Sequence, residues 1–141
     1  KSCTVSARAP GVLVIGADQV LECEGKIYSK PKDVKAAKEQ LTLLRGKKHT
    51  LISSVVVAEG GKRVWEHTDR SLLQMRKFSD SFLDDYILKH GKSVLDSPGC
   101  YQVEGAGIQL FTSIEGNHCT ILGLPLLPVL HYLRLRGVVA A

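Results

Sequence analysis

Apolar and polar positions along the chain first follow the spacing of β-strands. A short continuous apolar run at residues 12–15 predicts a buried strand. Glu24-Gly25 then predicts a two-residue turn into residues 26–28, so that Cys23 faces the first residue of the second arm of a hairpin. Later strands are predicted at residues 50–58, 64–78 and 107–114, with a hairpin turn at Gly60-Gly61.

Other segments have the spacing of helices. Asp33 and Ser79 are N-cap residues, and Pro125 suits a first helical turn. The helices are predicted from Asp33 to Gly46, from Ser79 to Gly91 and from Pro125 to Gly137. The apolar side of the last helix is predicted to consist of Leu126, Leu127, Leu130 and Leu133.

Strands and helices therefore mix without a repeating strand–helix–strand pattern. Hairpins and single helices of this kind favour an α+β or α/β fold, in which a mixed, twisted sheet is flanked by helices. The chain has 141 residues, enough for one domain with a hydrophobic core, and we expect a single domain over residues 1–141.

Composition removes several classes of function. The net charge of +5 is spread along the chain and forms no long basic stripe, which disfavours nucleic-acid binding. The four cysteines and five histidines show neither zinc-site spacing nor a secreted disulfide pattern. No apolar run is long enough to span a membrane, and no signal peptide is visible. We therefore expect a cytoplasmic protein without a membrane or nucleic-acid partner.

Asp18 and Lys30 are the first candidates for chemistry. Asp18 follows the apolar strand, and the two-residue turn brings Gln19 opposite Lys30. Strict alternation would put Asp18 and Lys30 on opposite faces, but Pro31 ends regular pairing and leaves the long lysine side chain free to swing. A carboxylate on a rigid strand is a ligand for Mg²⁺ or Mn²⁺, and a lysine is a point charge for phosphate. Each also has an ordinary interpretation as a solvated surface residue.

Other acidic residues are weaker candidates. Glu104 precedes a predicted strand and is either an exposed loop acid or a functional one. Asp69 lies on the long strand, whereas Asp84 and Asp85 are predicted to be solvated on a helix. The motifs of P-loop, Rossmann and nucleophile-elbow sites are absent from the sequence.

Several short stretches, in the same order along the chain, resemble the Maf family of nucleoside triphosphate pyrophosphatases. They include IGADQVL, SKPKD, LLRGKKHTLISSVVV, HTDRSLLQMRKFSDSFLDDYI and SPGCYQVEGAGIQLFTSIEGNHCTILGLPL. The resemblance implies a Maf/ITPase-like mixed sheet with helices, two lobes with a cleft, and hydrolysis of a nucleoside triphosphate to the monophosphate and pyrophosphate. It implies a divalent cation, Mg²⁺ or Mn²⁺, with Asp18 as the catalytic and metal-binding residue and Lys30 as a phosphate contact. A homodimer is a further expectation.

The chain also departs from the family pattern. A Ser-x-Ser-Pro-Arg-Arg segment that begins the family has no match here, so we expect an N-terminally truncated domain with weak hydrolysis and an adhesive sheet edge. Gln19 and Glu104 resemble the branch that acts on 7-methyl-GTP, and both are predicted to bind substrate. The alternatives are a dTTP or UTP pyrophosphatase, a non-enzymatic regulator of septum formation, or an inactive fragment.

Overall fold

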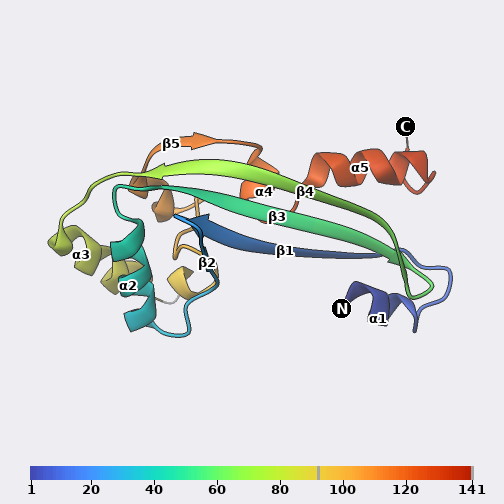
Figure 1. The fold of residues 1–141 in the computed structure, drawn as a ribbon, viewed down its shortest axis with the longest axis horizontal. Helices are drawn as coiled ribbons and strands as arrows, with labels where there is room; N and C mark the ends of the chain where they lie inside the picture. The colour runs from blue at the N-terminus through green and yellow to red at the C-terminus, as the bar shows by residue number, and fades with distance from the viewer. Residues whose placement is uncertain (92, 141) are drawn as a thin grey trace. The chain divides into compact units, whose positions relative to one another are not determined.

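The computed structural model of the protein describes residues 1–91 and 93–140 (Figure 1). Its strands are β1 (Val14–Cys23), β2 (Lys26–Tyr28), β3 (Lys48–Glu59), β4 (Lys62–Met75) and β5 (Phe111–Glu115). Its helices are α1 (Ser2–Ser6), α2 (Val34–Leu44), α3 (Asp80–His90), α4 (His118–Ile121) and α5 (Leu126–Leu135), with short 3-10 helices η1 (Ser93–Leu95) and η2 (Ala106–Leu110). The described strands form a five-stranded sheet in the order β2-β1-β3-β4-β5, and the predicted mixture of helix and strand is confirmed.

Two compact units divide the chain. Unit 1 contains Lys1–Gln19, Ile52–Arg70 and Asn117–Ala141, and unit 2 contains Val20–Leu51 and Ser71–Gly116. The boundary runs through β1, β3 and β4, so each unit takes part of these strands. Within the described part of the chain, no helix combines the length and apolar character needed to cross a membrane.

The hairpin of β1 and β2 in unit 2 confirms the predicted register. Leu21 pairs with Tyr28, and Cys23 pairs with Lys26. Glu24 and Gly25 have φ angles of 52° and 78°, and two consecutive positive φ values are what a type I′ hairpin turn requires. The short turn therefore fixes which side chains face each other.

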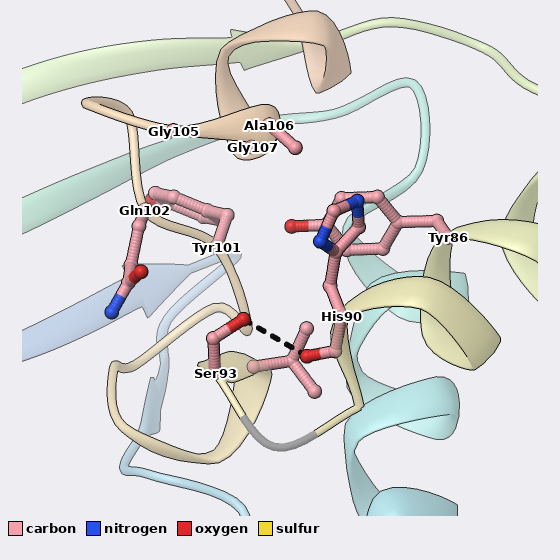
Figure 2. Close-up of a pocket in the computed structure, with 9 residues that line it drawn as sticks. Tyr86, His90, Ser93, Tyr101, Gln102, Gly105, Ala106 and Gly107 are labelled. Carbon is pink, nitrogen blue, oxygen red and sulfur yellow. Dashed lines mark hydrogen bonds between the residues drawn. The ribbon is translucent and has the colours of Figure 1, made fainter.

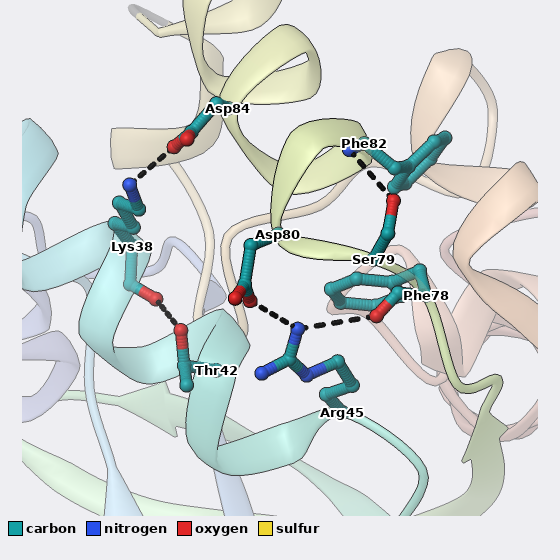
Figure 3. A network of polar contacts seen from close by, with 8 residues as sticks. All are labelled: Lys38, Thr42, Arg45, Phe78, Ser79, Asp80, Phe82 and Asp84. Atoms are coloured by element: carbon teal, nitrogen blue, oxygen red, sulfur yellow. Dashed lines mark hydrogen bonds and ion pairs between the residues drawn. The ribbon is translucent and has the colours of Figure 1, made fainter.

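The helices of unit 2 begin at the predicted caps. The Asp33 carboxylate accepts a hydrogen bond from the Ala36 amide, and the Ser79 hydroxyl accepts one from the Phe82 amide. Figure 3 shows α2 joined to α3 by ion pairs of Lys38 with Asp84 and of Arg45 with Asp80. Behind these exposed contacts, the buried core of the unit includes Leu21, Leu41, Leu44, Leu51, Leu73, Met75, Leu83 and Leu110.

The strand predicted at residues 107–114 begins later than expected. Residues 106–110 form η2, and the ladder with β4 starts at Phe111. A Cβ atom at Gly107 would stand 2.6 Å from the Gln102 carbonyl oxygen, so the backbone turns here in close contact with residues 101–102. The alternation of apolar residues concealed this tight turn, because five residues are too few for the spacing of apolar positions to distinguish a helical turn from a strand.

The buried side of α5 in unit 1 also differs from the predicted one. Val129 and Tyr132 are buried, whereas Leu126 and Leu127 are exposed. The Tyr132 ring stacks on Trp65 of β4 with ring centroids 4.9 Å apart. The aromatic stack, and not the number of leucines, therefore decides which face of the helix is covered.

Candidate active site

Asp18 lies on the part of β1 that belongs to unit 1, with its side chain exposed. Its Oδ1 atom accepts a hydrogen bond from the Gln19 amide at 2.9 Å. The residue lines a cleft of about 390 Å³ together with Gly16, Ala17 and Ser54, among others. Small neighbours and an exposed carboxylate leave Asp18 accessible to a ligand, as a catalytic or metal-binding residue requires.

Gln19 is tied into the protein by its amide nitrogen. The Nε2 atom is 2.8 Å from the Ser53 hydroxyl and 3.0 Å from the carbonyl oxygens of Thr120 and Ile121. Its two N–H groups are thus shared among three acceptors inside unit 1. The donor group of Gln19 is engaged in joining β1 to β3 and α4, which leaves its Oε1 atom as the group that could contact a substrate.

Asp69 on β4 belongs to the same polar network. Its Oδ2 atom accepts a hydrogen bond of 2.6 Å from the Thr120 hydroxyl, which lowers the pKa of the carboxyl group. The Ser53 hydroxyl in turn donates to the Thr120 carbonyl at 2.8 Å. Helix α4, which supplies Thr120, was not predicted; the Asn117 cap that begins it was the sequence signal for it.

The carboxylate of Asp18 suits a cation whose other ligands are substrate phosphates and water. Among residues 1–91 and 93–140, no group of three His, Cys, Asp or Glu side chains is placed to hold a metal ion. Mg²⁺ commonly binds through one or two carboxylates together with substrate phosphates and water. A single accessible carboxylate such as Asp18 fits that arrangement.

Lys30 lies in unit 2, two residues after the last pair of the β1–β2 ladder. Its side chain is exposed. The preceding residue, Ser29, has its carbonyl oxygen 3.2 Å from the Nε2 atom of buried Gln40. The lysine therefore extends from an irregular segment whose backbone is anchored to α2.

Glu104 is also in unit 2, exposed in the loop before η2. Neighbouring residues of this loop line a pocket of about 220 Å³. Figure 2 shows Tyr86 and His90 of α3 on one side of the pocket and Tyr101 and Gln102 on the other. The loop thus combines an accessible carboxylate with an adjoining pocket of aromatic and polar groups.

A buried histidine, His49, contacts the start of this loop. The Nε2 atom of His49 is 2.7 Å from the Tyr101 hydroxyl. The Tyr101 ring packs edge-on against the Phe111 ring, with the ring centroids 4.7 Å apart. Burial lowers the pKa of His49 to about 4 and raises that of Tyr101 well above its usual value. Both groups are therefore neutral at pH 7 and hold the start of the Glu104 loop in place.

The predicted site residues thus fall into two pairs. Asp18 and Gln19 adjoin each other in unit 1, and Lys30 and Glu104 both belong to unit 2. The family model described as Maf-like protein matches residues 1–136. The chain belongs to this family.

Similar proteins carry one shared name. The chain is 52% identical to a protein of Paramagnetospirillum magneticum over 97% of its own length and 71% of that protein. It is 48% identical to proteins of Granulibacter bethesdensis and Hyphomonas neptunium, over 92% and 98% of this chain and 66% and 69% of theirs. Each of the three is named nucleoside triphosphate pyrophosphatase. This Maf-like chain therefore spans about two thirds of the length of these relatives.

Proposed function

We propose that this Maf-like protein is a nucleoside triphosphate pyrophosphatase that acts in the cytoplasm. Water would attack the α-phosphorus, the bond from that phosphorus to the α–β bridging oxygen would break, and the monophosphate and pyrophosphate would leave. The observation that carries the proposal is the accessible Asp18 carboxylate in a cleft of a chain so similar to proteins of that name.

Asp18 has two chemical roles open to it. Its Oδ1 atom is oriented by the Gln19 amide, which leaves Oδ2 free to accept a proton from the attacking water or to bind Mg²⁺ or Mn²⁺. When bound, such a cation supplies charge neutralisation for the phosphate groups. The carboxylate is held on a strand rather than on a loop, so its position is fixed before substrate binds.

Lys30 would contribute positive charge to the phosphates. Nearly all catalysis of phosphoryl transfer comes from positioning and from electrostatic stabilisation of charge on the phosphate oxygens. The ammonium group is exposed, and its flexible stem allows it to reach an anion. Its role is to bind the triphosphate and to stabilise the charge that develops on the leaving pyrophosphate.

For the base, we propose 7-methylguanine, read by Glu104. A methylated guanine carries a positive charge and presents N–H donors, and a carboxylate can only accept hydrogen bonds when ionised. The exposed Glu104 carboxylate can supply both an opposite charge and hydrogen-bond acceptors for the N–H donors. The base of UTP or dTTP instead has a single N–H between two carbonyl acceptors, to which an ionised carboxylate cannot donate.

Product analysis tests this function. The protein is incubated with 7-methyl-GTP and Mg²⁺ or Mn²⁺, and again with EDTA, and the products are separated. We expect 7-methyl-GMP and pyrophosphate, no turnover with EDTA, and preference for 7-methyl-GTP when UTP and dTTP compete. Release of inorganic phosphate and a diphosphate would contradict the reaction, and preference for UTP would contradict the base assignment.

A further inference from the structure

Gln40 joins two segments of unit 2 that are far apart in the sequence. The residue lies on α2 with only 9% of its surface exposed. Its Nε2 atom donates a hydrogen bond to the Ser29 carbonyl at 3.2 Å. Its Oε1 atom accepts from the Gly99 amide at 2.9 Å and from the Cys100 thiol at 3.0 Å. One buried carboxamide thus contacts both the Ser29 segment and the 99–100 loop.

The first segment leads directly to Lys30. Strand β2 ends at Tyr28, and Pro31 has no N–H group with which to continue a ladder. The Ser29 carbonyl is therefore anchored by a side chain where strand pairing has ended. A shift of this carbonyl would move the backbone from which the Lys30 side chain extends.

The second segment leads to Glu104. Gly99 and Cys100 have φ angles of 81° and 63°, and a non-glycine residue in this left-handed region is strained. Burial raises the pKa of the Cys100 thiol to about 12, so the thiol stays protonated and can donate to Gln40. The next residue, Tyr101, is held by His49. The loop conformation thus depends on the Oε1 atom that accepts from both Gly99 and Cys100.

We propose that Gln40 is a positioning residue that sets the Lys30 segment and the Glu104 loop together. It contacts no substrate itself, and its effect on phosphate binding passes through Lys30 while its effect on base choice passes through Glu104. The inference rests on the proposed function for the roles of these two residues. The Nε2 and Oε1 atoms of one planar amide bond the two segments. Loss of Gln40 therefore weakens both phosphate binding and base selection.

Gln74 provides a matched control in the same unit. Its Nε2 atom donates to two backbone carbonyls, those of Gly46 and Met75, at 3.2 and 3.0 Å. Neither carbonyl adjoins Lys30 or Glu104. Gln40→Met and Gln74→Met therefore each remove hydrogen bonds from a side-chain amide to the backbone, and only the first is expected to affect nucleotide binding.

The test measures binding, so that it does not depend on turnover. The ligands are 7-methyl-GTP and UTP analogues with a methylene group between the α- and β-phosphates. Calorimetry gives Kd for the wild type, Gln40→Met, Gln74→Met, Lys30→Ala and the Gln40→Met/Lys30→Ala double variant. We expect Gln40→Met to raise Kd for the 7-methyl-GTP analogue about tenfold and to reduce the ratio of affinities for the 7-methyl-GTP and UTP analogues. Gln74→Met should change neither this Kd nor this ratio by more than about twofold.

The double variant separates positioning from general damage. If Gln40 acts through Lys30, Gln40→Met costs much less affinity in the Lys30→Ala background than in the wild type. Equal costs in the two backgrounds, or an unchanged base preference, would overturn the inference. Binding without hydrolysis by the wild type would instead contradict the proposed function, and a wild type that binds neither analogue would contradict both.

Gln40→Glu is a second variant that tests the link from Gln40 to Lys30 if Gln40→Met does not fold. When ionised, glutamate keeps acceptors for the Gly99 amide and the Cys100 thiol but loses the donor to the Ser29 carbonyl. Burial raises the pKa of a carboxyl group, so binding is measured on the alkaline side of the titration of this glutamate. We expect this variant to bind both analogues more weakly while it keeps the wild-type base preference. Wild-type affinity for both analogues would contradict the link from Gln40 to Lys30.

Discussion

The two units hold their candidate residues in different ways. In unit 1, Asp18 lies on a ten-residue strand, beside a polar network that runs through Gln19 and Thr120 to Asp69. In unit 2, Lys30 and Glu104 lie outside regular strands, on segments anchored by buried side chains. Residues that react need a fixed position, and residues that select a ligand can stand on loops supported by a scaffold. Under the proposed function, unit 1 would therefore carry the reacting carboxylate, and unit 2 the residues that contact the phosphates and the base.

The anchors also differ in chemistry. The network of unit 1 joins the buried hydroxyl groups of Ser53 and Thr120 to the half-buried amide of Gln19. Unit 2 relies on the buried amide of Gln40 and the buried imidazole of His49. A buried polar group that loses its partner costs more than an exposed one. Changes at the buried anchors of either unit should therefore affect stability as well as function.

The largest effect is expected at Asp18. Asp18→Asn keeps the shape of the side chain but removes the charge, and we expect pyrophosphate release to be abolished while the thermal unfolding temperature is unchanged. Pyrophosphate assays and a melting curve measure the two. Asp84→Asn, an exposed change on α3, is the control and should keep full activity. Near wild-type turnover by Asp18→Asn would show that the Asp18 carboxylate is not catalytic.

Lys30 tests the contribution of unit 2 to the same reaction. Lys30→Ala should cost about 3 kcal/mol of transition-state stabilisation, as expected for loss of one charge-stabilising donor. The measurement is kcat/KM for 7-methyl-GTP. Lys32→Ala, which removes an exposed positive charge two residues away, should change kcat/KM little. If the two variants behave alike, Lys30 is an ordinary surface lysine.

His49 makes unit 2 sensitive to acid. Its pKa is about 4 in the folded state and near 6.5 when unfolded, so the unfolded chain binds the proton first as pH falls. This group should remove roughly 3 kcal/mol of stability between pH 6.5 and pH 4, and none above that window. Urea unfolding at several pH values measures the loss, with His49→Gln as the variant that cannot titrate. An equal pH dependence in both proteins would show that His49 is not the source.

Glu104 is expected to have the smallest effect, on base choice alone. Glu104→Gln should reduce the preference for 7-methyl-GTP over UTP about tenfold, since one amide N–H replaces an acceptor. Competition between the two substrates measures this ratio. Glu115→Gln, a like change at the exposed end of β5, serves as the control. A preference that survives the change would assign base selection to other residues.

Local signals in the sequence predicted much of the fold. The two-residue turn at Glu24-Gly25 gave the hairpin register, and the caps at Asp33 and Ser79 gave two helix starts. The strand predicted at 107–114 and the buried side of α5 were wrong in detail, because tertiary contacts at Gly107 and Tyr132 decided them. The spacing of apolar residues along the chain indicates neither the close approach of Gly107 to residues 101–102 nor the stacking of Tyr132 on Trp65.

The candidate site was predicted less completely than the fold. Asp18, Lys30 and Glu104 were found as accessible charged residues at ends of elements, and their roles remain predictions. Gln40 was missed, although it lies at helical spacing with Ala37 and Leu44 on the buried side of α2. A polar residue on an apolar helix face was the available signal, since such a group needs buried partners.

Binding by Asp18→Asn in the absence of metal tests the division between the units most directly. Calorimetry with EDTA compares the affinity of 7-methyl-GTP for the wild type, Asp18→Asn and Lys30→Ala. Removal of a negative charge near a polyanion lowers repulsion, so we predict that Asp18→Asn binds as tightly as the wild type or more tightly, although it releases no pyrophosphate. Lys30→Ala should bind more weakly. Loss of metal-free binding in Asp18→Asn, with wild-type binding in Lys30→Ala, would contradict the account.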